Sequence, residues 1–359
     1  MIHIKSPGRI CLFGEHQDYL FYPVISMAIT KYVYLKAERI SSKKLLIELP
    51  DINDKIEIEL NDKELEYYSN RDYLRSAYNQ LLRKGIKFKR GFKIEITGDI
   101  PINAGVASSS ALIMAWLYFL NLICEDKFKL DPFRLAMEGY NTEVKEFSEA
   151  GGMMDHFTSI YGNLVYLKPE TPLPKFINKR CQLEGFVLGN SLEEKDTVED
   201  LFKVKKLAIK SFKALKESMP NFNQYTTSIE ELNQYLPNLK KEYQEKIIGN
   251  LTNRDLTIKA KNLIFNKKQT KDFYQELGTL LNLHQEQLKN NIKISTKKID
   301  EMIINCLEKG ALGAKINGSG FGGTMFSLFP KKENLLIEAI ENAGGEAFII
   351  KTSTGVKTY

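Results

Sequence analysis

The first hundred residues alternate between hydrophobic and polar positions, the pattern typical of β-strands. Four stretches show it: residues 2–12, 22–40, 44–60 and 91–100. Pro7 and Gly8 are expected to interrupt the first stretch. The second contains two separate strand-like segments, VISMAI and YVYLKAERI, and the third is typical of a hairpin that turns at residues 51–54. This part of the chain therefore predicts a sheet.

Helical spacing of apolar residues begins after residue 72 and dominates the second half of the chain. Residues 73–85 predict a helix closed by Gly85. The apolar run at 108–124 predicts a buried helix, and Asp131 followed by Pro132 is a typical helix start. Further helices are predicted at residues 196–219, 227–249, 253–265, 270–290, 296–309 and 332–343, and a final strand at 346–352. The change to lysine-rich helices near residue 180 suggests two domains, 1–178 and 179–359.

The composition is that of an ordinary globular protein. Hydrophobic residues make up 43% of the 359 residues and charged residues 27%. The net charge of +6 is small for this length, and the lysines of residues 203–216 are typical of a solvated helix face, so we expect no nucleic-acid partner. The apolar run Ala111–Cys124 is shorter than the ~20 residues of a membrane span. Without a signal peptide or paired cysteines, the sequence predicts a cytoplasmic protein that binds no membrane.

Two glycine- or serine-rich stretches have the chemistry of phosphate loops. INAGVASSSALIMAW, residues 102–116, places small residues and three serines before a buried helix, whose N-terminus attracts anions. A serine hydroxyl at this place is also a ligand for Mg²⁺. The alternative is simple N-capping by serine. The second stretch is NGSGFGG, residues 317–323. Its glycines allow the backbone to come into close contact with a ligand, and the alternative interpretation is a tight hairpin.

Two further stretches concentrate charged and polar side chains. GRICLFGEHQDYL, residues 8–20, offers alternating hydrogen-bond acceptors and donors that suit a polyhydroxylated ligand; its alternative is a surface turn. GGMMDHF, residues 151–157, places Asp155 after an apolar approach. A carboxylate held beside a cation there stays ionised and accepts or orients a proton, whereas the alternative is an N-cap.

In this order, the four stretches resemble the motifs of the GHMP kinase superfamily, and galactokinases are the nearest branch. GRICLFGEHQDY is similar to the sugar-binding signature, PINAGVASSSA to the phosphate loop, GGMMDHF to the G-x-MDQF segment and NGSGFGGTMFSL to the C-terminal glycine motif. The resemblance implies an α+β, two-domain GHMP kinase fold. An N-terminal domain like domain 2 of ribosomal protein S5 would pack on an α/β C-terminal GHMP domain, with the active site between them.

The resemblance also implies a role for particular residues of an ATP-dependent sugar 1-kinase. Asp155 and Arg9 become the catalytic pair, and Ser109 and Glu143 become the Mg²⁺ ligands. The expected sugar-binding residues are Glu15, His16, Asp18 and Gly152. The expected ATP-binding residues are Gly105, Val106, Ala107, Ser108, Ser109, Ser110 and Gly320. The adenine is expected between the helix at 72–84 and the phosphate loop.

Departures from the family pattern leave the substrate open. Tyr22 stands where the family has glycine, close to the sugar-binding signature. Gln17 replaces a threonine, and His156 replaces a glutamine beside Asp155; we expect His156 to be hydrogen-bonded near the site rather than to contact the substrate. The alternatives are a mevalonate-type kinase, a non-catalytic galactokinase-like sugar sensor and an S5-like nucleic-acid-binding protein. We expect a monomer or a weak homodimer.

Overall fold

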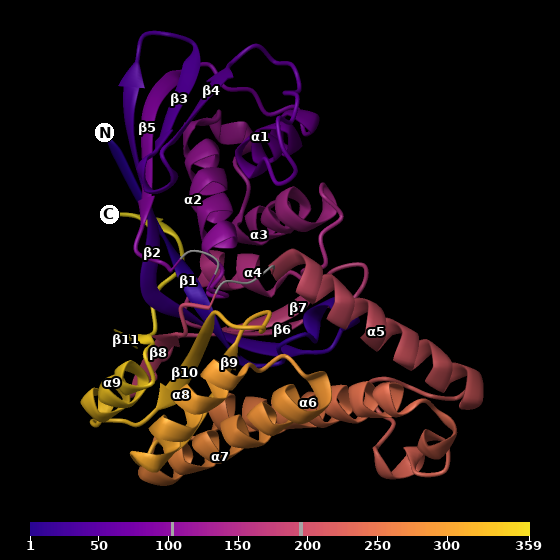
Figure 1. The fold of residues 1–359 in the computed structure, drawn as a ribbon. Helices are drawn as coiled ribbons and strands as arrows, with labels where there is room; N and C mark the ends of the chain where they lie inside the picture. The colour runs from indigo at the N-terminus through magenta and orange to yellow at the C-terminus, as the bar shows by residue number, and fades with distance from the viewer. Residues whose placement is uncertain (102–103, 194–196) are drawn as a thin grey trace.

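The computed structural model describes residues 1–101, 104–193 and 197–359 (Figure 1). Ile102 and Asn103, at the start of the predicted phosphate loop, and residue 196, the predicted start of a helix, lie outside the described residues.

Within the described residues, the strands form two sheets (Figure 1). The eight-stranded sheet has the order β12-β1-β2-β5-β3-β4, with β6 and β7 attached through β2; β3 and β5 pair in parallel, and the other described pairs are antiparallel. Its strands are β1 (Ile2–Phe13), β2 (Val24–Ile40), β3 (Lys44–Leu49), β4 (Asp54–Glu59), β5 (Gly91–Gly98), β6 (Leu164–Lys168), β7 (Lys175–Lys179) and β12 (Lys357–Thr358). The four-stranded sheet consists, in spatial order, of β11 (Glu346–Ile350), β8 (Phe186–Asn190), β10 (Thr324–Leu328) and β9 (Gly313–Asn317).

The helices divide between the two sheets. α2 (Ser108–Ile123) and α4 (Met154–Tyr161) lie against the first sheet, and α1 (Tyr73–Arg83) and α3 (Pro132–Tyr140) pack on α2. α2 lies against β1 and β2 and is apolar around most of its surface, as a helix enclosed by other elements must be. The others are α5 (Thr197–Ser218), α6 (Lys241–Asn266), α7 (Lys271–Gln287), α8 (Lys297–Glu308) and α9 (Glu333–Asn342).

Separate hydrophobic clusters stabilise the packing of the helices on the sheets and on each other. One lies between the four-stranded sheet and α8 and α9. Another joins α5 and α6 to the segment that follows the predicted sugar-binding turn, through Leu20 and Tyr22. The α5–α6 pair projects from the rest of the molecule in Figure 1. The residues after Asp18 are therefore anchored in the helical part of the chain, although they belong to the N-terminal part of the sequence.

Two of the strand predictions need correction. The interruption expected at Pro7-Gly8 is wrong, because β1 runs through it with a shift of register against β2 between Pro7 and Arg9. A bulge of this kind changes the direction of a side chain without ending the strand. The two segments predicted within residues 22–40 form the single strand β2. The hairpin at 44–60 is confirmed as β3 and β4.

The helices predicted at 227–249 and 253–265 are also partly wrong. Residues 241–266 form one continuous helix, α6, and only short 3₁₀ turns precede it, at Glu230–Leu232 and Leu236–Asn238. Gly249, the predicted end of the first of these helices, lies inside α6, where a side chain would collide with Asn291 and Ile292. Tertiary packing thus requires a glycine there without ending the helix.

The α+β GHMP kinase architecture is confirmed. The division at 178/179 stays a prediction; the first sheet reaches Lys179, the second starts at Phe186, and β12 returns to pair with β1. The four cysteines are free, as expected. Among the described residues, no helix combines the length and apolar character that a membrane span requires.

Candidate active site

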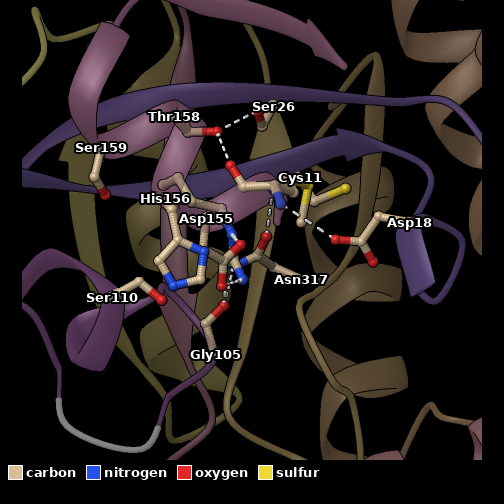
Figure 2. Close-up of polar contacts among 12 residues, drawn as sticks. Cys11, Asp18, Ser26, Gly105, Ser110, Asp155, His156, Thr158, Ser159 and Asn317 are labelled. Carbon is tan, nitrogen blue, oxygen red and sulfur yellow. Dashed lines mark hydrogen bonds and ion pairs between the residues drawn. The ribbon is translucent and has the colours of Figure 1, made fainter. Parts of the chain in front are cut away.

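A cavity of about 260 Å³ is lined by residues from all four predicted motifs. Figure 2 shows Asp155 and His156 next to each other on α4, with Gly105, Ser110, Asn317 and Asp18 around them. These residues are separated by up to three hundred positions in the sequence. The sequence prediction that the motifs lie close together is therefore matched by their arrangement in space.

Arg9 and Asp155 form a bidentate ion pair at this cavity. Arg9 Nε donates to Asp155 Oδ1 at 2.7 Å, and Arg9 Nη2 donates to Oδ2 at 2.8 Å. The third nitrogen, Nη1, donates to the carbonyl of Gly105 at 2.6 Å. Burial lowers the pKa of Arg9, but the charge of Asp155 and the hydrogen bond to it outweigh that effect, so the pKa is raised. The guanidinium is thus a fixed cation between the carboxylate and the predicted phosphate loop.

The predicted phosphate loop and the C-terminal glycine loop contact each other. Asn317, the last residue of β9, donates to the Gly105 carbonyl at 2.9 Å, and its side-chain oxygen accepts from the backbone of Cys11 at 2.8 Å. Gly318 has a φ of +78°, and a side chain there would collide with the Gly105 carbonyl. The close approach of the two loops therefore requires glycine at 318.

The serines at the start of α2 do not cap the helix. The residue before them, Ala107, adopts a φ of 61°, in the left-handed region, and no side chain caps this end. Ser109 and Ser110 instead donate to the two oxygens of Glu143, both at 2.6 Å. The alternative of simple serine N-capping is wrong. The first backbone N–H groups of α2, which have no partner within a helix, remain at the cavity wall with Ser108.

Glu143 lies on a π-helical segment, Asn141–Lys145, that continues α3. His156 Nε2 lies 2.7 Å from Glu143 Oε2, which confirms that His156 is hydrogen-bonded beside the site. Burial alone would raise the pKa of Glu143, but hydrogen bonds and charge from His156 and hydrogen bonds from Ser109 and Ser110 lower it. The carboxylate is therefore held ionised.

The predicted sugar-binding turn presents Asp18 to the cavity. Asp18 Oδ1 accepts from the backbone of Tyr19 at 2.9 Å, and Oδ2 accepts from the backbone of Met154 at 3.3 Å. Burial and the neighbouring charge of Asp155 raise the pKa of Asp18 to about 6. His16 Nδ1 lies 2.8 Å from Tyr19 Oη, and Nε2 lies 2.9 Å from the Ser319 carbonyl, so this imidazole joins the turn to the glycine loop.

Gly152→Ala is expected to damage this turn selectively. A methyl group at 152 would occupy the position of the Asp18 carboxylate, and the carboxylate would have to move. We expect the KM of the phosphoryl acceptor to rise by at least about tenfold while the KM of ATP changes little. Gly151→Ala is the matched control, because its added carbon meets only Val144 Cγ2 at 3.5 Å, an ordinary contact. Equal effects of the two substitutions would contradict the assignment of Asp18 to the acceptor.

Glu15 lines the cavity but is committed to a buried ion pair. Its Oε1 pairs with Lys315 Nζ, which also donates to the carbonyls of Cys11 and Ile316. Both side chains are at most 1% exposed. Burial raises the pKa of Glu15, and the charge of Lys315 opposes this. Glu15 Oε2 is buried 3.7 Å from His284 Nδ1 and has no hydrogen-bond partner among the described residues, so this side chain serves the ion pair rather than a ligand.

Two predicted site residues, Val106 and Gly320, lie away from the lining, and so does Tyr22, whose contact with the substrate the sequence leaves open. Val106 is buried, and its carbonyl accepts from the backbone of Arg9 at 3.1 Å. Gly320 packs against Ile294, where a side chain would collide. Tyr22 is buried in the α5–α6 cluster against Phe212 and is not part of the cavity wall. The assignment of Val106 and Gly320 to ATP stays a prediction, and Tyr22 does not reach the cavity.

Sequence reasoning missed several residues of the wall. Tyr73, Arg71 and Glu149 line the cavity, and Tyr73 Oη donates to Glu149 Oε1 at 2.5 Å. Tyr73 begins α1, the helix expected beside the adenine. An aromatic residue at the start of this helix was the available signal. Lys315, the buried partner of Glu15, gave no signal, because only the fold brings the two side chains together.

The residues around Glu143 fit a magnesium ion that is shared with a phosphate. Within the described residues, no group of three or more His, Cys, Asp or Glu side chains is arranged to hold a metal. Mg²⁺ in nucleotide sites is typically bound by one or two carboxylates together with the phosphates. An ionised Glu143 beside the Ser109 hydroxyl provides such oxygen donors.

Comparison with known proteins agrees with this architecture. The profile of the GHMP kinase N-terminal domain matches residues 72–163, and that of the C-terminal domain matches residues 270–347. The galactokinase galactose-binding signature matches residues 2–39. The fold and both matched domains therefore define a kinase. The chain belongs to the GHMP kinase family.

Relatives of two specificities match the whole chain. A mevalonate kinase of Pyrococcus furiosus is 27% identical and covers 97% of this chain and 95% of its own. A galactokinase of the same organism is 26% identical and covers 99% of both. Among solved structures, Lactococcus lactis galactokinase in complex with galactose has a TM-score of 0.83 at 20% identity, and covers 99% of this chain and 94% of its own. Methanococcus jannaschii mevalonate kinase has a TM-score of 0.70 at 20% identity, with 98% of both chains covered.

Proposed function

We propose that this protein transfers the γ-phosphoryl group of ATP to the anomeric hydroxyl of a monosaccharide and releases a sugar 1-phosphate. The Arg9–Asp155 pair carries this proposal. It lies between the predicted phosphate loop, which Arg9 contacts at Gly105, and the polar turn that presents Asp18. Phosphoryl transfer depends mainly on positioning and on stabilising charge, and this arrangement supplies both.

Asp155 is the proposed acceptor or orienting group for the hydroxyl proton. Its bidentate partner Arg9 fixes the orientation of the carboxylate and supplies a positive charge close to the transferred phosphoryl group. The N-terminus of α2 would bind the phosphates of ATP, as kinases of this family use ATP as substrate. Glu143 and Ser109 would hold Mg²⁺, which neutralises the charge of those phosphates.

The sugar is proposed to lie against Asp18, His16 and Gly152. Asp18 offers carboxylate oxygens to the hydroxyl groups of a sugar. Because residue 152 has no side chain, the Asp18 carboxylate can lie close to the start of α4. The galactose-binding signature over residues 2–39 supports a sugar at this turn. A mevalonate-type acceptor is the second candidate, because the mevalonate kinase relatives match the chain as well as the galactokinases do.

The test is a panel of acceptors with Mg·ATP. It contains galactose, other hexoses, deoxy sugars, uronic acids and mevalonate, with ATP consumption as the readout and ³¹P NMR to locate the new phosphate ester. We expect turnover with a reducing sugar and a product phosphorylated at the anomeric carbon. Turnover with mevalonate alone would replace the sugar assignment, and absence of Mg·ATP binding would refute the kinase proposal.

Acceptor binding is expected to weaken below pH 6. Because the pKa of Asp18 is about 6, its carboxylate becomes protonated there and loses a hydrogen-bond acceptor. The acceptor KM should then rise by about tenfold per pH unit. The pKa of Asp18 is higher in the folded protein than in the unfolded chain, so its ionised carboxylate lowers the folding stability above pH 6. Acidification below pH 6 protonates the group and removes this destabilisation. Acceptor KM measured from pH 7.5 to 5 in wild type and in Asp18→Asn, which should show no such rise, checks this.

A further inference from the structure

The proposed Mg²⁺ carboxylate is held by an unusually complete set of donors. Glu143 Oε2 accepts from Ser110 Oγ at 2.6 Å and from His156 Nε2 at 2.7 Å, whereas Oε1 accepts from Ser109 Oγ at 2.6 Å. The side chains of His156 and Glu143 are 1% and 8% exposed. Each carboxylate oxygen has two lone pairs. Among the described residues, both lone pairs of Oε2 thus accept hydrogen bonds, whereas Oε1 has one lone pair without a donor.

The fold makes room for the imidazole that completes this set. Gly139, in the last turn of α3 and four residues before Glu143, faces the ring, and a side chain there would lie 2.8 Å from His156 Cδ2. Tyr140 packs with an edge-to-face geometry, at 6.2 Å between ring centroids. Because Glu143 is ionised, Nε2 must carry the proton in this hydrogen bond. Nδ1 is buried and has no hydrogen-bond partner among the described residues.

Among the residues that the structure describes, His156 therefore has one hydrogen-bond partner, Glu143. Burying Nδ1 without a hydrogen-bond partner costs folding free energy. An apolar side chain at this position would avoid that cost, so packing alone does not explain a histidine here. Hydrogen bonds to metal-binding carboxylates fix their orientation, and their loss typically costs ~10–100-fold in metal affinity.

We propose that His156 is a positioning residue for the metal: with Ser110 it occupies Glu143 Oε2, so that Oε1, beside Ser109, is the oxygen left for Mg²⁺. This inference rests on the proposed function. It assigns to His156 no contact with the substrate and no proton transfer. It also accounts for the two neighbouring serines, because each binds a different oxygen of the same carboxylate.

The test measures Mg²⁺-dependent nucleotide binding rather than turnover. A non-hydrolysable ATP analogue is titrated at increasing Mg²⁺, and the Mg²⁺ concentration for half-maximal binding is compared among variants. His156→Leu removes the donor and should raise that concentration by about tenfold or more. His156→Gln retains an N–H donor and should stay within about threefold of wild type. Ser110→Ala removes the other donor to Oε2 with little change in volume, and it should shift the value in the same direction.

Phe133→Leu is the control for a merely structural effect. Phe133 packs on Phe157, the neighbour of His156 in α4, at 5.7 Å between ring centroids, and it has no group that could donate a hydrogen bond to Glu143. It should lower the melting temperature without changing the Mg²⁺ dependence. If His156→Leu and Ser110→Ala behave like Phe133→Leu, the inference is overturned while the proposed function stands. If wild type shows no Mg²⁺-dependent nucleotide binding, the proposed function itself fails.

Discussion

Asp155→Asn is expected to lower kcat by roughly a thousandfold while Mg·ATP binding is retained. The amide cannot accept the hydroxyl proton, and a positioned proton acceptor typically contributes ~10²–10⁴-fold to rate. Arg9 keeps its hydrogen bond to the Gly105 carbonyl, so the phosphate loop should remain in place. Steady-state kinetics and nucleotide titration on the same preparation measure the two quantities.

Asp126→Asn is the matched control for this substitution. The Asp126 side chain is 92% exposed and forms a surface ion pair with Lys129. It should leave both kcat and nucleotide binding unchanged. A variant at Asp155 that retained wild-type kcat would rule out its proposed role, and a protein with no turnover in either form would favour the sugar-sensor alternative.

Lys315→Met is expected to lower the free energy of unfolding by about 3–5 kcal/mol, because it leaves the buried Glu15 carboxylate without its cation. Lys315 also donates to two backbone carbonyls, which would lose a donor. Chemical denaturation followed by circular dichroism measures the change. The loss should be large enough to lower the yield of folded protein.

The double variant Glu15→Gln/Lys315→Met separates charge from packing. Removing both charges should recover most of the lost stability, because the cost of an unpaired buried charge disappears. Lys309→Met is the surface control: its pair with Glu338 is about half exposed on both sides and should contribute only ~0–1 kcal/mol. Equal losses at positions 309 and 315 would contradict the account of the buried pair.

The sequence predicted local structure best where the apolar periodicity and the capping residues indicated the same element. The helix at 73–85 with its closing Gly85, the capped start at Asp131 and Pro132, and the buried helix at 108–124 are confirmed. It was wrong where tertiary packing overrode a local signal. Pro7-Gly8 makes a bulge rather than a break, and Gly249 serves a close approach inside α6.

The candidate site shows the same division. Arg9 and Asp155 were named from motifs, yet their bidentate contact depends on β1 and α4 meeting across 146 positions of sequence. His156 was expected to be hydrogen-bonded, but its partner Glu143 was not foreseen. Lys315 carried no motif signal, because an isolated lysine in a strand is ordinary until the fold buries it against a carboxylate.

The sequence by itself determined the residue types, the helical and strand periods and the order of the motifs, because these depend on neighbours along the chain. Only the tertiary structure decided which side chains share a buried volume and how charges pair there. Those contacts join residues far apart in sequence, and their strength comes from exclusion of water, which no local pattern contains.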